Sequence, residues 1–139
     1  MKIIDHFVEG KNYSGNSERT SIIYNPATGE ATAKVKLGST KDLNSAVEVA
    51  QQAFLNWSNT PPLQRARVLF KFKELIEKNE EELIKIIVSE HGKVYEDARG
   101  SLTRGLEVVE YACGIPQMLK GEFTENVGKN VDSWSLRQP

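Results

Sequence analysis

The sequence predicts an α+β fold that is mainly helical and begins with a small β-meander. Residues 7 to 36 alternate short β-prone runs with turn residues, which is typical of strands joined by tight turns. Residues 39 to 113 repeat apolar side chains at i, i+3, i+4 and i+7, which is the spacing of amphipathic helices. Residues 131 to 137 begin a strand pattern that stops at Pro139, so we expect the chain to be part of a larger fold.

Turn residues separate the N-terminal strands. The first turn passes through Gly10, and a β-prone run follows at Ser21–Tyr24. Pro26 presets φ near about −65° and Gly29 can adopt a positive φ, so a tight connection leads into a strand over residues 31–37. A meander of two or three strands is only marginally stable in isolation, so we expect it to lie on a larger body.

Two helices follow the strands. Ser39 with Asp42 three residues later resembles a capping box, and it opens a helix that extends to about Trp57. A break rich in proline then starts a second helix, from Pro62 to about Lys78, because a proline is tolerated in the first turn. The second helix carries two apolar stripes on roughly opposite sides: Val68, Leu69, Phe72, Leu75 and Ile76, and Leu63, Ala66 and Phe70.

A third helix is predicted to start at Asn79, with Glu82 at the capping-box position, and to end at His91 and Gly92. It is apolar on nearly all sides. A helix on the outside of a small monomer needs only one apolar stripe, so these helices require additional neighbours. One possibility is that further chain or another subunit supplies these neighbours. The alternative is that the helices cover one another in a compact, self-sufficient bundle.

The fourth helix, over residues 98–113, places a candidate binding residue on its polar side. Its core-facing stripe includes Ala98 and Cys113, whereas Gly100 and Arg104 fall on the other side with Glu107 and Tyr111. A glycine one turn before an arginine leaves room beside the guanidinium, so Arg104 could hold a carboxylate with two parallel hydrogen bonds. The alternative is an ordinary solvated helix face.

The C-terminal stretch is predicted to contain one strand. Residues 114–116 end the helical periodicity, and residues 121–129 are expected to form a polar loop. The strand at residues 131–137 then has no evident partner apart from the distant N-terminal meander.

Composition excludes several partner classes. The 139 residues contain 18 basic and 19 acidic side chains, for a net charge of −1, so no strong field attracts nucleic acid or an anionic membrane. No apolar run approaches the roughly 20 residues that cross a bilayer. The start of the chain contains Asp5 and His6 where a signal peptide would be apolar, so we expect a cytoplasmic protein.

The residues suggest no catalytic, cofactor or metal site. His6 and His91 are far apart and have no neighbours at metal-ligand spacing. The acids at 80–82 suit the dipole of a first helical turn, and the glycines of the 100–105 segment lie inside a helix rather than in a phosphate loop. Cys113 lies on the buried stripe, where we expect an inert packing thiol.

Several motifs nevertheless resemble the aldehyde dehydrogenase family. Three of them are typical of the whole superfamily: Asn25–Glu30, the segment 57–69 with Gln64–Arg67 inside it, and Glu90–Lys93. A more specific resemblance is to the CoA-acylating methylmalonate-semialdehyde dehydrogenase branch, and it rests on Arg104–Pro116, Leu119–Glu122, residues 126–128 and residues 137–139. The resemblance covers residues 7 to 139 and implies the first part of the α/β aldehyde dehydrogenase fold.

The resemblance implies an NAD-dependent enzyme that oxidises a carboxyl-bearing semialdehyde to an acyl-CoA. The family's nucleophilic cysteine, oxyanion-hole asparagine and nucleotide-binding strands all follow the point that corresponds to Pro139. We therefore expect NAD and CoA to serve the whole enzyme, and this fragment alone to bind no cofactor and to be inactive. In this branch the arginine of the Arg-Gly-Leu-Glu motif faces the substrate carboxylate, so the resemblance assigns substrate binding to Arg104.

The family fold would place residues 1–121 in the N-terminal portion of the NAD-binding domain and residues 122–139 at the start of the oligomerisation hairpin. The implied partners are the remainder of a dehydrogenase chain, further copies in a homo-oligomer and a small semialdehyde, with no nucleic acid and no membrane. The alternative hypothesis is a stand-alone helical interaction module without catalysis, which would bind a partner through its two-sided helices.

Overall fold

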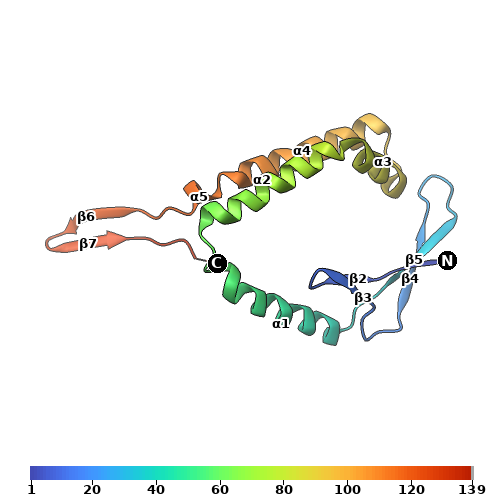
Figure 1. The fold of residues 1–139 in the computed structure, drawn as a ribbon, viewed down its shortest axis with the longest axis horizontal. Coiled ribbons are helices and arrows are strands. Elements are labelled where there is room, and N and C mark those ends of the chain that lie inside the picture. The colour runs from blue at the N-terminus through green and yellow to red at the C-terminus, as the bar shows by residue number, and fades with distance from the viewer. Residues whose placement is uncertain (139) are drawn as a thin grey trace. The chain divides into compact units, whose positions relative to one another are not determined.

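A computed structural model describes residues 1–138. In chain order its elements are β1 (Lys2–Ile4), β2 (His6–Val8), β3 (Lys11–Tyr13), β4 (Thr20–Tyr24), β5 (Ala31–Lys36), α1 (Thr40–Trp57), α2 (Pro62–Lys78), α3 (Glu80–His91), α4 (Tyr95–Cys113), α5 (Ile115–Met118), β6 (Phe123–Gly128) and β7 (Val131–Trp134) (Figure 1). A mainly helical chain with strands at its N-terminus confirms the predicted fold class. No helix in the described range is both long enough and apolar enough to span a bilayer.

The chain divides into two compact units. The N-terminal unit consists of Met1–Asn59 and Ile84–Ala98, and the C-terminal unit of Thr60–Leu83 and Arg99–Pro139. The first contains β1 to β5, α1 and most of α3. The second contains α2, most of α4, α5 and the last two strands.

The N-terminal strands form two sheets. One has the order β1-β5-β4, in which β1 runs parallel and β4 antiparallel to β5, so that Ile3 and Ile22 both lie opposite Lys34. The other is the antiparallel hairpin of β2 and β3. The predicted meander therefore consists of two hairpins and an additional parallel strand, β1. No local turn signal specifies a parallel pairing, because its two strands are joined by a long crossover.

The capping box at the start of α1 is confirmed. Ser39 Oγ accepts a hydrogen bond from Asp42 N at 3.3 Å, and Asp42 Oδ2 accepts one from Ser39 N at 2.7 Å. These two bonds satisfy amide groups that the first turn of a helix leaves without partners. As predicted, α1 ends at Trp57 and α2 extends from Pro62 to Lys78.

Asn79 connects α2 to α3. Its backbone carbonyl accepts from Leu83 N at 3.0 Å, and α3 starts at Glu80, close to the prediction, with three acids in its first turn. Its side-chain amide, however, donates to the carbonyl oxygen of Leu75 at 2.6 Å. This side chain therefore stabilises the last turn of α2.

Two sequence-based boundaries are wrong. α4 begins at Tyr95, ahead of the predicted start at Ala98. Residues 121–129, which were predicted to be a loop, contain β6, which pairs antiparallel with β7 and gives that strand a local partner. Asn126 and Asn130 adopt φ values of 52° and 59°, a backbone region that asparagine tolerates, so these two residues allow the irregular backbone of the hairpin.

The base of the β6–β7 hairpin is closed tightly. Ser135 N donates to the carbonyl oxygen of Glu122 at 2.9 Å, and Ser135 Oγ accepts from Glu122 N at 3.0 Å. A Cβ atom added to Gly121 would lie only 1.8 Å from the carbonyl oxygen of Ser135. Only glycine fits at this close approach of two backbones.

The buried apolar core of the described chain is small. Its buried apolar residues are Ala33, Ala66, Ile84, Ala98 and Cys113. Large apolar side chains on both stripes of α2 remain exposed, although Ala66 is buried: Leu63 and Phe70 are 58% and 54% exposed, and Val68 and Phe72 are 56% and 50% exposed. The C-terminal unit alone therefore does not cover α2 as a self-sufficient bundle would.

Within the N-terminal unit, Gly92 packs directly against Pro26. Gly92 ends α3 with φ of 75°, and its amide donates to the carbonyl oxygen of Val88 at 2.9 Å. A Cβ atom at this position would lie 3.2 Å from two ring carbons of Pro26. Two of the sequence motifs, Asn25–Glu30 and Glu90–Lys93, thus meet at this contact.

We expect Gly92→Ala to destabilise the N-terminal unit. The left-handed backbone costs a non-glycine residue about 1–2 kcal/mol, and the added methyl group also presses on Pro26. The measurement is the free energy of unfolding of the chain in urea. Gly10→Ala is the matched control, because Gly10 has a similar φ of 74° but open space around it. An equal loss in both variants would show that the contact with Pro26 is energetically neutral.

Candidate functional site

Arg104 lies at the middle of α4 with its side chain exposed. Within the described residues it forms no hydrogen bond and no ion pair. On the same side of the helix Val108 is 68% and Tyr111 is 73% exposed. A charged group without an internal partner beside exposed apolar side chains is available to a ligand or to further protein.

Gly100 lies next to the Arg104 guanidinium, as the sequence predicts. A Cβ atom built on Gly100 would lie 3.6 Å from Nη1 and 4.0 Å from Nη2 of Arg104. The guanidinium therefore extends along the helix toward its N-terminus, the direction that long side chains take from a helix. The structure brings the two residues together, and the role of Arg104 in binding a carboxylate stays a prediction.

The side of α4 that faces α2 is occupied. Figure 1 shows the two helices side by side, and Lys73 of α2 forms an ion pair with Glu110 of α4 at 3.4 Å. Ile76 and Leu102 line the same small hollow between these helices. Cys113 is buried at 8% exposure, consistent with the predicted packing position.

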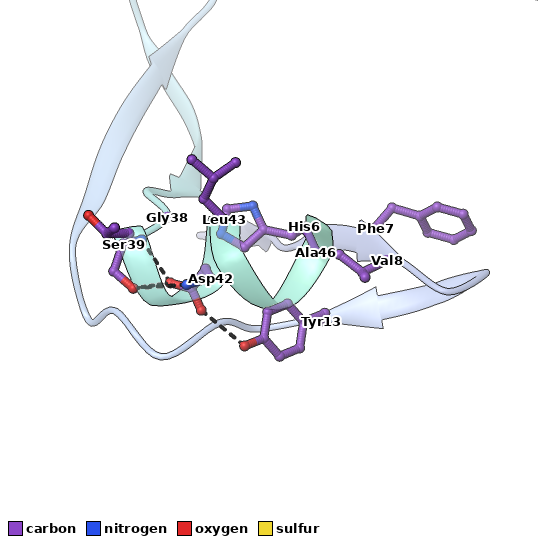
Figure 2. A pocket seen from close by; sticks show the side chains of 10 residues that line it. His6, Phe7, Val8, Tyr13, Gly38, Ser39, Asp42, Leu43 and Ala46 are labelled. Atoms are coloured by element: carbon purple, nitrogen blue, oxygen red, sulfur yellow. Dashed lines mark hydrogen bonds between the residues drawn. The ribbon is translucent and has the colours of Figure 1, made fainter. Parts of the chain in front are cut away.

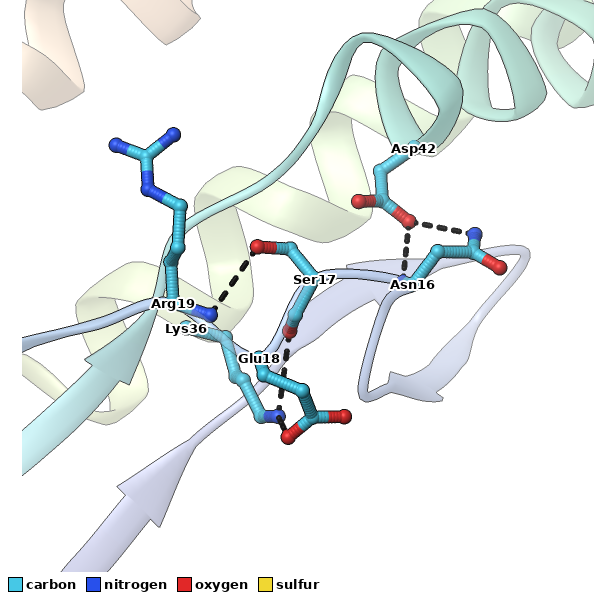
Figure 3. A network of polar contacts seen from close by, with 6 residues as sticks. All are labelled: Asn16, Ser17, Glu18, Arg19, Lys36 and Asp42. Atoms are coloured by element: carbon cyan, nitrogen blue, oxygen red, sulfur yellow. Dashed lines mark hydrogen bonds and ion pairs between the residues drawn. The ribbon is translucent and has the colours of Figure 1, made fainter.

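A second polar cluster surrounds Asp42, at the start of α1. Asp42 is only 6% exposed. Its Oδ1 accepts hydrogen bonds from Tyr13 Oη at 3.0 Å, Asn16 N at 2.7 Å and Asn16 Nδ2 at 2.8 Å (Figures 2 and 3). Its Oδ2 accepts from Ser39 N at 2.7 Å and from Ser39 Oγ at 2.6 Å. A buried charge of this kind is tolerated because five donors replace its water.

These hydrogen bonds shift two pKa values. The bonds from Ser39 above all, and those from Asn16, hold the pKa of Asp42 far below its ordinary value. The bond to Asp42 raises the pKa of Tyr13, because a phenol that donates to a carboxylate retains its proton. Both groups therefore keep their ordinary neutral-pH charge states more firmly than free side chains.

An open hollow of about 540 Å³ lies beside this cluster. His6, Phe7, Tyr13 and Leu43 contribute to its walls, and Figure 2 shows Asp42 directed toward Ser39 and Tyr13. The carboxylate already accepts five hydrogen bonds inside the protein. The hollow therefore offers a ligand mainly apolar walls, and we assign it no chemistry.

A neighbouring ion pair holds the chain between β3 and β4 against β5. Lys36 Nζ lies 3.7 Å from Glu18 Oε2 and donates to the carbonyl oxygen of Ser17 at 3.4 Å (Figure 3). The glutamate is fully exposed, so this contact positions the loop and contributes little stability.

The other residues considered for chemistry lie apart. His6 is in the N-terminal strands and His91 ends α3, and within residues 1–138 no three histidine, cysteine or acidic side chains form a group that could hold a metal ion. Gly100 and Gly105 both lie inside α4, so they do not form a phosphate loop.

Arg65 was not singled out as a site residue from the sequence. It lies in the first turn of α2, and its Nε is buried without a hydrogen-bond partner among the described residues. A buried unpaired donor is costly, and Arg65 is therefore a position at which the described residues do not satisfy a polar atom. The spacing of apolar residues indicates which side of a helix is buried. It does not indicate whether a single nitrogen on that helix finds a hydrogen-bond partner.

Comparison with known proteins decides the family. The model of the aldehyde dehydrogenase family matches residues 13–139. The chain belongs to the aldehyde dehydrogenase family. This aldehyde dehydrogenase chain is 49% identical to a malonate-semialdehyde dehydrogenase of Pseudomonas aeruginosa, covering 100% of this chain and 28% of the relative.

Two further comparisons agree. An acylating methylmalonate-semialdehyde dehydrogenase from Arabidopsis thaliana mitochondria is 41% identical over 98% of this chain, which covers 22% of that relative. The crystal structure of a Sinorhizobium meliloti protein in complex with NAD superposes with a TM-score of 0.93 at 47% identity, covering 100% of this chain and 28% of the other. The aldehyde dehydrogenase chain thus spans between a fifth and a third of the length of these relatives.

The turn from β5 into α1 of this aldehyde dehydrogenase chain does not suit the pyrophosphate of a dinucleotide. A pyrophosphate binds at a glycine-rich turn from a strand into a helix, where free amide groups face it. The strand-to-helix turn here, from β5 through Gly38 and Ser39 into α1, is closed by the Asp42 carboxylate, which accepts from Ser39 N. A pyrophosphate at this turn would meet that negative charge.

We expect Asp42→Asn to lower the stability of the N-terminal unit and to flatten its pH dependence. The folded-state pKa is depressed, so the carboxylate contributes stability above the unfolded pKa of about 3.9, and this stability is lost as the pH falls further. The measurement is the urea midpoint between about pH 7 and about pH 2. Asp5→Asn is the control, because the Asp5 side chain makes no hydrogen bond within the described residues. Identical pH profiles for wild type and Asp42→Asn would contradict the role of Asp42.

Proposed function

We propose that this chain is the N-terminal part of an NAD-dependent, CoA-acylating dehydrogenase that acts on malonate or methylmalonate semialdehyde. The observation that carries the proposal is Arg104, an exposed guanidinium without an internal partner on α4. The family and the named activities of the relatives support it. In such a reaction an aldehyde, CoA and NAD⁺ give an acyl-CoA, NADH and a proton: the aldehyde hydrogen leaves as hydride and the CoA thiol loses its proton.

Arg104 would bind the carboxylate that a semialdehyde carries at the end opposite its aldehyde. The guanidinium is planar, and its two outer nitrogens match the two oxygens of a carboxylate. A substrate held at this end has its aldehyde a fixed distance away, so the arginine both selects the substrate and orients it. A simple aldehyde lacks the group that this arginine recognises.

NAD and CoA would serve the whole enzyme. When bound, NAD supplies the hydride acceptor and CoA the thiol that receives the acyl group. We propose that this stretch alone is inactive and that the rest of a longer chain binds both molecules. The Asp42 carboxylate at the turn into α1, which disfavours a pyrophosphate there, supports this.

The same proposal divides the chain between two parts of the dehydrogenase fold. Residues 1–121 would belong to the NAD-binding domain, and residues 122–139 would begin the hairpin that joins subunits. The β6–β7 hairpin supports this, because Phe123, Val131 and Trp134 are 66%, 54% and 67% exposed. An apolar hairpin that its own chain leaves uncovered is suited to a homo-oligomer.

The remainder of a dehydrogenase chain would be the other partner. The exposed apolar side chains on both sides of α2 support a larger body around this helix. We propose that the complete enzyme acts in the cytoplasm on a small-molecule semialdehyde.

The test is the Arg104→Ala variant of the full dehydrogenase chain that contains these residues. Two charge-assisted hydrogen bonds, worth about 1.5–3 kcal/mol each, would be lost, so kcat/KM for malonate semialdehyde should fall by at least about a hundredfold. The kcat/KM for propanal should change little, and Arg104→Lys should recover only part of the loss because a point charge does not match two oxygens.

Propanal is the internal control for this experiment. A general folding defect depresses both substrates alike, whereas a lost carboxylate contact depresses only the semialdehyde. Equal losses on both substrates would assign Arg104 a structural role and remove the main support for the proposed substrate.

A further inference from the structure

The orientation of the Arg104 guanidinium relative to Gly100 is specific. The position that a Cβ atom of residue 100 would take lies 3.6 Å from Nη1 and 4.0 Å from Nη2, and no other atom outside the local backbone is within 4 Å of it. The central carbon Cζ is therefore farther away than both outer nitrogens. Only a point toward the outer edge of the guanidinium, beyond the two Nη atoms, satisfies these distances. The missing side chain of Gly100 thus leaves space on that edge.

The outer edge is where a carboxylate binds with two parallel hydrogen bonds. In such a pair each oxygen lies about 2.7–2.9 Å from a nitrogen, within the plane of the guanidinium. A side chain at position 100 would project into the region from which the carboxylate approaches. Its first carbon would make ordinary contact with the arginine, so it would not displace the guanidinium, but it would crowd the carboxylate.

Helix formation does not explain this glycine. Gly100 lies inside α4, where alanine is the more favourable residue. Its backbone is not among the glycines with positive φ, so the conformation does not require glycine either. Gly105 lies in the same helix and has nothing within 4 Å of its Cβ position. Gly100 differs from Gly105 in that its Cβ position lies next to the outer edge of the Arg104 guanidinium.

We infer that Gly100 is a specificity-determining positioning residue: its missing side chain keeps the outer edge of the Arg104 guanidinium open to the carboxylate of a semialdehyde. The inference rests on the proposed function, in which Arg104 binds that carboxylate. It adds that the selectivity for carboxyl-bearing substrates depends on an absent side chain one turn away from the charge.

The experiment uses the full dehydrogenase chain that contains these residues, with three variants: Gly100→Ala, Gly105→Ala and Arg104→Ala. KM and kcat are measured with malonate semialdehyde and with propanal. Gly100→Ala should raise KM for malonate semialdehyde by about tenfold, which corresponds to weakening one charge-assisted hydrogen bond, and should change kcat less. Its kinetics with propanal should stay the same, because propanal has no carboxylate to crowd.

Gly105→Ala is the matched control, because it makes the same substitution in the same helix away from the guanidinium. It should leave the ratio of kcat/KM for the two substrates unchanged. Alanine favours the helix at both positions, so neither variant is expected to unfold. If Gly100→Ala leaves the ratio unchanged, or lowers it no more than Gly105→Ala does, the inference is overturned.

Arg104→Ala separates this inference from the function on which it rests. If Arg104→Ala lowers the ratio and Gly100→Ala does not, Arg104 binds the carboxylate and Gly100 has no part in it. If Arg104→Ala also leaves the ratio unchanged, the proposed carboxylate site is wrong, and the inference about Gly100 is overturned with it.

Discussion

The carboxylate of Asp42 is the interaction on which the N-terminal unit depends. It accepts hydrogen bonds from Tyr13 and Asn16, which belong to β3 and the loop after it, and from Ser39 at the start of α1. One buried charge therefore fixes the first turn of α1 and holds the β2–β3 hairpin against it. The same charge closes the turn between β5 and α1 to anions, and the carboxylate site that we propose lies elsewhere, on α4.

Local chemistry predicted most of the fold. The spacing of Ser39 and Asp42 specifies a capping box, and the structure contains it, but no local pattern indicates that Tyr13 and Asn16 complete the site. The same limit applies to β1, whose parallel partner β5 is distant in sequence. The β6 strand was missed for a different reason: Glu125, Asn126 and Gly128 are depleted in strands and interrupt its β-prone residues, so its pairing with β7 is not evident from the sequence.

The candidate site was predicted in part. Helical periodicity places Gly100 and Arg104 on the side of α4 away from the core, and the structure confirms that Arg104 is exposed beside Gly100. Periodicity cannot give the rotation of a guanidinium, which decides which of its edges meets a ligand. Nor can it identify the buried Nε of Arg65, whose environment depends on packing between elements. The sequence therefore predicts which side of a helix a residue occupies, whereas the direction of a single polar atom is known only from the three-dimensional structure.

The closed base of the β6–β7 hairpin has a mechanical consequence. Both strands are exposed along their length, so within the described chain the hairpin is held only where Gly121 meets Ser135. A six-residue strand such as β6 extends about 20 Å from that base. The hairpin can therefore rotate as a unit about its narrow base, and a rotation of a few degrees at Gly121 would move the tip of the hairpin by roughly 2 Å. A side chain at position 121 would change the direction of the whole hairpin, whereas substitutions at the tip of the hairpin would leave its base unchanged.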